Sequence, residues 1–326
     1  MNNLLTDIPG LTVGHATDLA LGSGVTAILF DQPAIASVAI LGGAPGGRDT
    51  HMLEPEMTVE GVDAIVLSGG SAFGLDAAGG VQAMLRQAGR GLDVRGMRIP
   101  IVSQAIIFDL ANGGDKNWGR FSPYRDLGDA AACAARPGKF TLGTVGAGTG
   151  ATTATVKGGL GSASTLTGSG HTVAALAVVN AVGSPTIADG PWFWAAPFEV
   201  KDEFGARGWP TPMPANANAF RTKGGPGTAT TIGLVVTDAM LTKPQAKRLA
   251  IMAHDGLARA ILPAHAPMDG DTIFAAAIGT RPLGNALTEL GHAATLTMAR
   301  AIARGVYEAT PLPVPGAQQS WRQRFG

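Results

Sequence analysis

Short apolar runs that end in glycine-rich turns alternate along this chain with apolar stripes of helical period, and this alternation limits the fold. The clearest run is residues 172–180, almost entirely Val, Ala and Leu before it ends in Asn180. The clearest stripe lies between Thr242, a helix-capping type of residue, and Pro263. The run is typical of a buried strand and the stripe of an amphipathic helix. Because the two types are mixed throughout, the chain is predicted to be α/β or α+β.

Other segments fit the same scheme. Further strands are expected at residues 12–16, 25–30, 37–41, 64–67 and 232–237, and further helices at 75–85, 126–135 and 287–307. Residues 185–227 contain Trp192, Trp194 and Trp209, several prolines and little periodicity, so they are expected to form a long excursion from the core. The Pro- and Gln-rich tail from Pro311 on is expected to be loose.

Composition excludes several classes of function. Charged residues make up only 15% of the 326 residues, and 24 basic residues balance 24 acidic ones, so no net charge steers the chain to nucleic acid or to an anionic membrane. No apolar run nears the length of a membrane span, and no signal peptide is recognisable. Cys133, the single cysteine, is expected to pack as a small hydrophobe. We therefore expect a cytoplasmic protein that contacts neither nucleic acid nor membrane.

The six histidines show no close pairing of the kind that binds a metal, so neither a metal nor another cofactor is expected. Cys133 alone cannot build a cysteine-based metal cluster or an intrachain disulfide.

The acidic turn Asp269-Gly270-Asp271 places Thr272 at the first position of an apolar run. If the peptide bond before Thr272 were cut, its nitrogen would become a free α-amine, with a pKa of about 7.7–8.0. Such an amine can act as general base for the hydroxyl of the same residue. From these residues alone, a plain turn followed by a strand is the better explanation of the pattern.

Four further motifs decide between these readings. They are 67–76 (LSGGSAFGLD), 112–119 (NGGDKNWG), 146–151 (GAGTGA) and 157–162 (KGGLGS). Together with 269–272 (DGDT) they resemble the self-processing L-aminopeptidase/D-esterase family, which includes β-peptidyl aminopeptidases and nylon-oligomer hydrolases. The resemblance runs from about residue 5 to about residue 307.

The resemblance implies a four-layer αββα sandwich, similar to that of N-terminal-nucleophile hydrolases. It implies one domain, residues 1–326, that cuts itself between Asp271 and Thr272 into fragments 1–271 and 272–326. The expected activity is an aminopeptidase or amidase that acts on small peptides or amides through an acyl-enzyme on Thr272. The low charge and the tryptophan-bearing excursion add the expectation of a homo-oligomer, a tetramer of cleaved protomers.

The same resemblance assigns roles to individual residues. Asn180 occupies the family's oxyanion position, although the residues alone favour an asparagine that closes a turn. Lys157 matches the lysine of a Lys-Gly-Gly motif and would keep the Thr272 amine neutral; otherwise it is an ordinary exposed charge. Thr149 and Gly150 belong to a glycine-rich turn that could be an anion-binding nest or a plain hairpin.

Four more residues complete the expected substrate site. The resemblance places Phe108 and Thr155 where nylon-oligomer hydrolases carry a tyrosine and a lysine, which argues against nylon-oligomer activity. Asn285 and Glu289 are candidates for the polar pair that the family places beside the nucleophile.

Two other functions stay open at this level. The first is endo-hydrolysis of 6-aminohexanoate oligomers, favoured by threonine as the nucleophile. The second is nucleotide binding, because residues 68–74 resemble a glycine-rich phosphate loop, although no G-x-G-x-x-G or Walker lysine is present.

Overall fold

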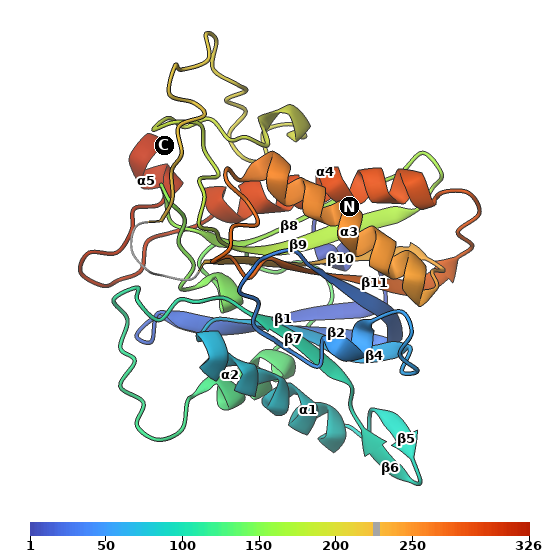
Figure 1. The fold of residues 1–326 in the computed structure, drawn as a ribbon. Coiled ribbons are helices and arrows are strands. Elements are labelled where there is room, and N and C mark those ends of the chain that lie inside the picture. Colours follow the sequence, from blue (N-terminus) through green and yellow to red (C-terminus); the bar gives the residue numbers. More distant parts are fainter. Residues whose placement is uncertain (224–228) are drawn as a thin grey trace.

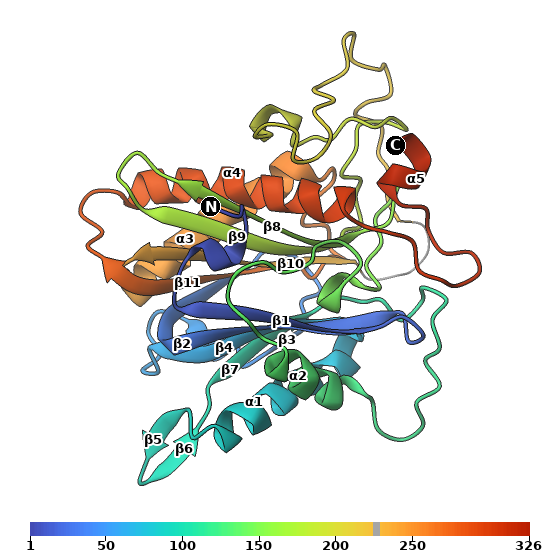
Figure 2. The ribbon, with the colours of Figure 1, turned by 180° about the vertical axis from the view of Figure 1, so that it is seen from behind.

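The computed structural model describes residues 1–223 and 229–326, whose helices and strands form four layers (Figure 1, Figure 2). Helices α3 (Lys243–Ala260) and α4 (Leu287–Tyr307) cover one outer face. Helices α1 (Ala77–Gln87) and α2 (Tyr124–Cys133) cover the opposite face. Two layers of β-sheet lie face to face between the helices. The expected αββα sandwich is thus confirmed.

The strands of both layers belong to one hydrogen-bonded path, in the order β3-β7-β4-β2-β11-β10-β9-β8, with β1 paired to β2 beside it. Their bounds are β1 (Leu11–Asp18), β2 (Ser23–Ile40), β3 (Gly47–Arg48), β4 (Gly61–Ser68), β7 (Val102–Ile106), β8 (Gly159–Leu166), β9 (Thr172–Asn180), β10 (Thr230–Ala239) and β11 (Thr272–Arg281). A separate hairpin consists of β5 (Leu92–Val94) and β6 (Met97–Ile99).

Strand β2 connects the two sheet layers. Its first half pairs with β1 and β4, and its second half pairs with β11. The register shifts between Leu29 and Ala34, where Asp31, Gln32 and Pro33 are exposed. The sequence predicts two strands here, at 25–30 and 37–41, and this is wrong: a bulge, not a turn, interrupts one strand of 18 residues.

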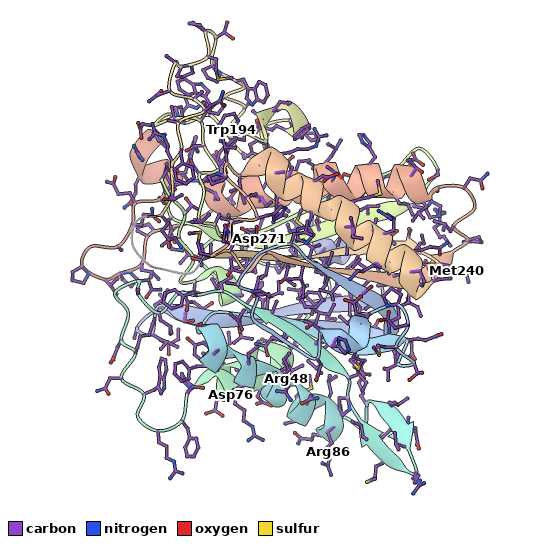
Figure 3. All side chains as sticks on the ribbon, viewed as in Figure 1. Arg48, Asp76, Arg86, Trp194, Met240 and Asp271 are labelled. Atoms are coloured by element: carbon purple, nitrogen blue, oxygen red, sulfur yellow. The ribbon has the colours of Figure 1, made fainter. Side chains whose placement is uncertain are left out.

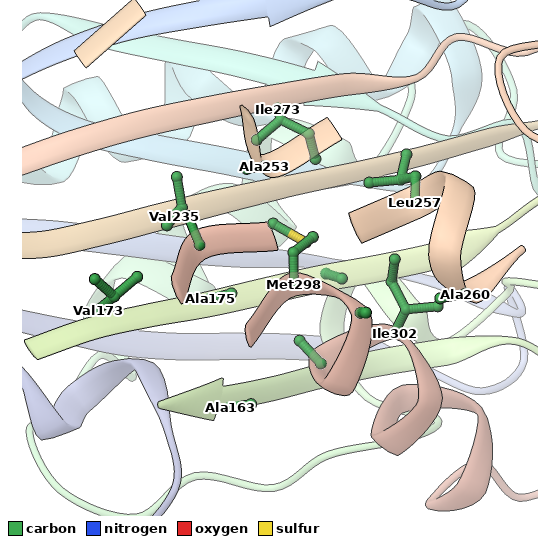
Figure 4. Close-up of a cluster of buried hydrophobic side chains, with 14 of the residues drawn as sticks. Ala163, Val173, Ala175, Val235, Ala253, Leu257, Ala260, Ile273, Met298 and Ile302 are labelled. Atoms are coloured by element: carbon green, nitrogen blue, oxygen red, sulfur yellow. The ribbon is translucent and has the colours of Figure 1, made fainter. Parts of the chain in front are cut away.

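Apolar side chains fill all three spaces between the layers. Between the two sheets pack Phe30, Leu176 and Phe274. Between the sheet layer that carries β8 to β11 and the helices α3 and α4, Leu257 and Met298 lie against the strands, as Figure 4 shows. A third cluster of apolar side chains lies between the other sheet layer, which carries β1, β4 and β7, and the helices α1 and α2. The sheet that carries β9, β10 and β11 is therefore buried on both faces, which fixes the positions of the strand ends.

Two expectations about the periphery are corrected by the structure. The tail from Pro311 is ordered: α5 (Trp321–Phe325) returns to the body of the molecule, and Trp321 is buried against Phe193 and Tyr307. Cys133 is exposed at the end of α2, so it is not a packed hydrophobe.

The excursion is confirmed over residues 185–223, which contain little regular structure; its remaining residues, 224–227, lie outside the described residues. In the described part of the chain, no helix combines the length and apolarity that a membrane crossing needs.

Candidate active site

Three strand ends meet at one end of the sheet and bring the predicted residues together. Asn180 ends β9 and pairs with Thr230 at the start of β10. Ile232, two residues further along β10, pairs with Thr272 at the start of β11. Because β9 runs antiparallel to β10, and β10 parallel to β11, the end of one strand lies beside the starts of the other two. The strand order thus places Asn180 and Thr272 at the same end of the strands.

Thr272 is the first residue of β11 and is buried. Its hydroxyl donates a hydrogen bond to the carbonyl oxygen of Gly270, at 2.9 Å. On either side, Thr272 pairs with Ile232 of β10 and Ile40 of β2. The hydroxyl that is predicted to attack the preceding carbonyl therefore has a fixed position in the intact chain.

The carboxylates of the acidic turn are also fixed. The Asp271 carboxylate accepts hydrogen bonds from the backbone nitrogens of Thr231 (2.7 Å) and His265 (3.0 Å), and from Nδ1 of His265 (2.8 Å). Asp271 lies within the body of the molecule, directly before the internal strand β11 (Figure 3). Asp269 accepts from the backbone nitrogens of Val182 and Ala266. Burial, and then the nearby charge of Asp271, raise the pKa of Asp269 to about 6.

Asn180 is fully buried and each end of its side-chain amide has a partner. Its Nδ2 donates to the carbonyl oxygen of Phe108 at 2.9 Å. Its Oδ1 accepts from the backbone nitrogen of Thr152 (3.0 Å) and from Nζ of Lys223 (2.8 Å). An amide nitrogen carries two hydrogens, so one remains beyond the bond to Phe108.

Two lysines lie in this region, Lys157 buried and Lys223 half-buried. The Nζ of Lys157 donates to the carbonyl oxygens of Gly148 (3.2 Å) and Gly158 (2.9 Å). Burial, opposed by the charge of Asp109 and supported to a smaller extent by the charge of Lys223, lowers the pKa of Lys157 to about 7. Burial likewise lowers the pKa of Lys223 to about 8. Lys157 is therefore not an exposed charge, and its amine is largely neutral above pH 7.

A cavity of about 480 Å³ opens beside Asn180. The two residues that Asn180 holds, Thr152 and Lys223, are part of its wall, as is the predicted substrate residue Phe108. The remaining lining residues are Asp109, Ala111, Asn112, Gly113, Thr153, Pro315, Gly316 and Gln318. The C-terminal tail thus supplies one side of the cavity, where Gln318 is hydrogen-bonded through its side chain to both backbone groups of Thr153.

Of the six predicted substrate residues, Phe108 lines this cavity, whereas Thr149, Gly150, Thr155, Asn285 and Glu289 do not. Thr149 is buried behind it, and its hydroxyl donates to the Gly146 carbonyl. The Gly150 carbonyl accepts from Asn112. The Thr155 hydroxyl is hydrogen-bonded to that of Ser184. The glycine-rich turn is not an anion nest either, because the amides of Gly146 and Ala147 already donate to threonine hydroxyls.

Asn285 and Glu289 lie at the wrong end of the sheet for the predicted role. They follow β11, whose ten residues carry the chain about 30 Å away from Thr272. Glu289 lies in the first turn of α4 and accepts from the backbone nitrogens of Gly168 and Ser169. The prediction that this pair lies beside the nucleophile is therefore wrong.

The structure also removes the basis for nucleotide binding at residues 68–74. The Gly70 amide donates to the carboxylate of Asp109 at 2.7 Å, so a protein anion already occupies the position of a phosphate. A Cβ added to Gly70 would lie 2.2 Å from the ring of Tyr124, which shows that these glycines serve close packing.

Asp109 and Lys223 are the site residues that the sequence did not single out. Asp109 is buried, accepts from Ser23 and Gly70, and has a raised pKa because of that burial. Only its position directly after Phe108 could have drawn attention to it. Lys223 lies in the irregular excursion, where no local pattern marks it. Among the described residues, no group of three or more His, Cys, Asp or Glu side chains is arranged to hold a metal ion.

Comparison with known proteins gives consistent results. The model of peptidase family S58 matches residues 3–319. An uncharacterized aminopeptidase of Mycobacterium bovis is 40% identical over 99% of both chains. A 6-aminohexanoate-oligomer endohydrolase of Agromyces sp. is 30% identical over 82% of this chain and 73% of its own.

Among solved structures, the L-aminopeptidase D-Ala-esterase/amidase of Ochrobactrum anthropi, described as a variant of the Ntn hydrolase fold, superposes with a TM-score of 0.71. It is 20% identical and the match covers 98% of this chain and 91% of that one, so it identifies the fold.

Proposed function

This chain belongs to peptidase family S58 and is a peptide or amide hydrolase with an N-terminal-nucleophile fold, and from this premise we propose that it processes itself and then acts through Thr272. The proposed reaction cuts the chain between Asp271 and Thr272. Thr272 then carries a free α-amine as general base and a hydroxyl as nucleophile. Small peptides or amides with a free amino terminus are the proposed substrates.

One observation carries this proposal: Thr272 is the first residue of a central strand, and its hydroxyl is fixed in the turn that precedes it. A nucleophile at the start of a strand between two others keeps its place after the chain is cut, because β2 and β10 continue to hold it. A threonine that only favoured strand formation would not need a buried, oriented hydroxyl next to a buried acidic turn.

The surrounding charges support the chemistry. Lys157, whose pKa burial lowers to about 7, still carries part of its charge near neutral pH, and that charge would lower the pKa of the Thr272 α-amine and keep it in the neutral form that acts as base. Asn180 has a second amide hydrogen for an oxyanion on the substrate. Thr272 is not among the residues that line the cavity of Phe108, Asp109 and Lys223, and we propose that the Asp269–Asp271 turn, once cut from Thr272, moves aside and opens the cavity toward the nucleophile.

Hydrolysis of 6-aminohexanoate oligomers is the second candidate, since the Agromyces relative acts on them by its name. The cavity wall gives an apolar ring at Phe108, and Thr155 turns its hydroxyl to Ser184. Neither provides the phenol or ammonium group that the resemblance assigns to those positions in nylon-oligomer hydrolases. We therefore rank small amino-terminal amides first.

The test begins with the purified protein on a denaturing gel. Two fragments, 1–271 and 272–326, are expected, and the small one should begin with Thr272 on N-terminal sequencing. Thr272→Ala should leave one full-length chain, because no hydroxyl remains to attack. A different first residue in the small fragment contradicts the assignment of Thr272.

Aminoacyl p-nitroanilides, β-aminoacyl amides and 6-aminohexanoate oligomers, offered side by side to cleaved protein, should show the first or second class turned over fastest. Preference for the oligomers would reverse the ranking of substrates. Light scattering of the cleaved protein tests the proposed homo-tetramer. A particle made of one 1–271 fragment and one 272–326 fragment would contradict it.

A further inference from the structure

The carbonyl that self-cleavage must attack already has two hydrogen-bond donors. The oxygen of Asp271 accepts from the backbone nitrogens of Leu41 (3.1 Å) and Gly42 (3.2 Å), which directly follow β2. We propose that these two amides are the oxyanion donors for cleavage of the chain before Thr272. This inference rests on the proposed self-processing.

A plain continuation of the sheet does not explain this contact. Thr272 pairs with Ile40, so the antiparallel ladder between β11 and β2 accounts for one donor to Asp271, that of Leu41. The second donor, Gly42, exists because the chain turns so that two successive amides point at one oxygen. Two N–H groups on one carbonyl oxygen form the arrangement that stabilises tetrahedral intermediates of acyl transfer.

The close approach of this turn depends on glycine. A Cβ on Gly42 would lie 2.2 Å from the nitrogen of Asp271 and 2.4 Å from the oxygen of Asp269. A Cβ on the next residue, Gly43, would lie 2.5 Å from the oxygen of Pro267. Both clashes are with backbone atoms, which cannot rotate away. The Leu41–Gly43 segment is therefore packed against the scissile bond at a distance that only glycine permits.

The residue that carries the scissile carbonyl is held from the other side as well. Three donors fix the Asp271 carboxylate, as described above, and the Asp269 carbonyl accepts from the Ala44 nitrogen at 2.8 Å. The carbonyl of Asp271 thus cannot rotate away from its donors. Such fixed donors need no reorganisation when negative charge develops.

The step balances as follows. The Thr272 oxygen forms a bond to the Asp271 carbonyl carbon, and the carbonyl electron pair moves to the oxygen that Leu41 and Gly42 hold. The hydroxyl proton passes to the Thr272 nitrogen, the electron pair on the oxyanion re-forms the carbonyl as the carbon–nitrogen bond breaks, and an ester with a free amine results. Water then hydrolyses the ester, leaving a carboxylate on Asp271 and the hydroxyl on Thr272.

Self-cleavage and substrate hydrolysis would then use different donors. The side-chain nitrogen of Asn180 donates to Phe108 at the cavity, whereas the Asp271 oxygen faces the end of β2. The expectation that Asn180 serves the oxyanion is thereby restricted to hydrolysis.

Leu41→Pro removes one of the two donors, because proline has no N–H. The Leu41 side chain is 48% exposed, and proline's demand for an extended preceding residue matches Ile40 in β2. The matched control is Met240→Pro. Met240 is exposed, directly follows β10, and donates to the carbonyl of Arg281 at the other end of β11. Figure 3 shows Met240 far from Asp271.

Both variants and the wild type would be made by pulse-labelled cell-free synthesis, and conversion to the 1–271 fragment would be followed with time. Leu41→Pro should be cleaved about 10²–10³-fold more slowly than wild type, the usual loss for one oxyanion donor. Met240→Pro should be cleaved within threefold of wild type. Thermal unfolding of both variants in a Thr272→Ala background should show similar losses of stability.

If wild type stays intact, the proposed self-processing fails. If wild type is cleaved and Leu41→Pro matches Met240→Pro in rate, the oxyanion inference alone is overturned. Should Leu41→Pro not fold, an α-hydroxy acid analogue of leucine at position 41 removes the same N–H through an ester bond. Cleavage of that protein within threefold of wild type would equally overturn the inference.

Discussion

Asn180→Asp tests the predicted role of Asn180 in hydrolysis with little change of shape. The carboxylate can still accept from Thr152 and Lys223. It loses both amide hydrogens, one bonded to Phe108 and one available to the substrate oxyanion. Loss of one oxyanion donor should lower kcat by about 10²–10³, equivalent to about 2.7–4 kcal/mol in the transition state.

Asn180→Ala is a less informative change, because it removes all three hydrogen bonds of a fully buried side chain. A buried polar group left without a partner costs about 1–3 kcal/mol. The alanine protein would leave Thr152, Lys223 and Phe108 in that state and should lose stability together with activity. The aspartate protein leaves only the Phe108 carbonyl without its donor.

The assay measures kcat and KM of fully cleaved protein with an aminoacyl p-nitroanilide. KM should change less than kcat, since the negative charge exists mainly in the transition state. Asn218→Asp, at an exposed position of the excursion, is the matched control and should leave both constants unchanged. A folded, cleaved Asn180→Asp protein with kcat within threefold of wild type would refute the oxyanion role.

Two further predictions use the Thr272→Ala protein, which stays one chain. Burial lowers the pKa of Lys157 from 10.5 to about 7, so the unfolded chain binds more protons above pH 7. The free energy of unfolding should therefore rise with pH between about 7 and 10.5, and Lys157→Met should reduce this slope in denaturant titrations. Trp321→Ala should cost about 3–5 kcal/mol of stability because Trp321 is buried, whereas exposed Trp209→Ala should cost far less in the same titration.

The strands and helices that the sequence predicted are those with strong periodicity, and the convergence of Asn180 and Thr272 follows from them once the strand order is known. The break expected inside β2 was wrong because an exposed Asp-Gln-Pro bulge has the composition of a turn. The loose tail was wrong for another reason: one buried tryptophan, Trp321, orders a segment whose prolines and glutamines suggest disorder.

The candidate site was predictable only where chemistry and local motif coincide, as at Thr272. Lys223 and Asp109 come from segments with no pattern of their own and meet Asn180 and the cavity through long-range folding. Asn285 and Glu289 were misplaced because the resemblance set them beside the nucleophile, whereas the ten-residue strand β11 carries the chain away from Thr272 before it reaches them. The roles assigned to Thr272, Asn180 and Lys157 stay predictions until the variants are measured.

The central position of β11 has a consequence for a chain cut before Thr272. The small fragment would begin with a strand hydrogen-bonded to β2 on one side and β10 on the other, and near its other end Trp321 would lie buried in the core. The fragments could separate only by opening the sheet, so they would exchange between molecules no faster than the protein unfolds. Refolding would then require two chains to meet, and stability would depend on protein concentration. A single cut would thus turn a reversible fold into one maintained by its slow unfolding.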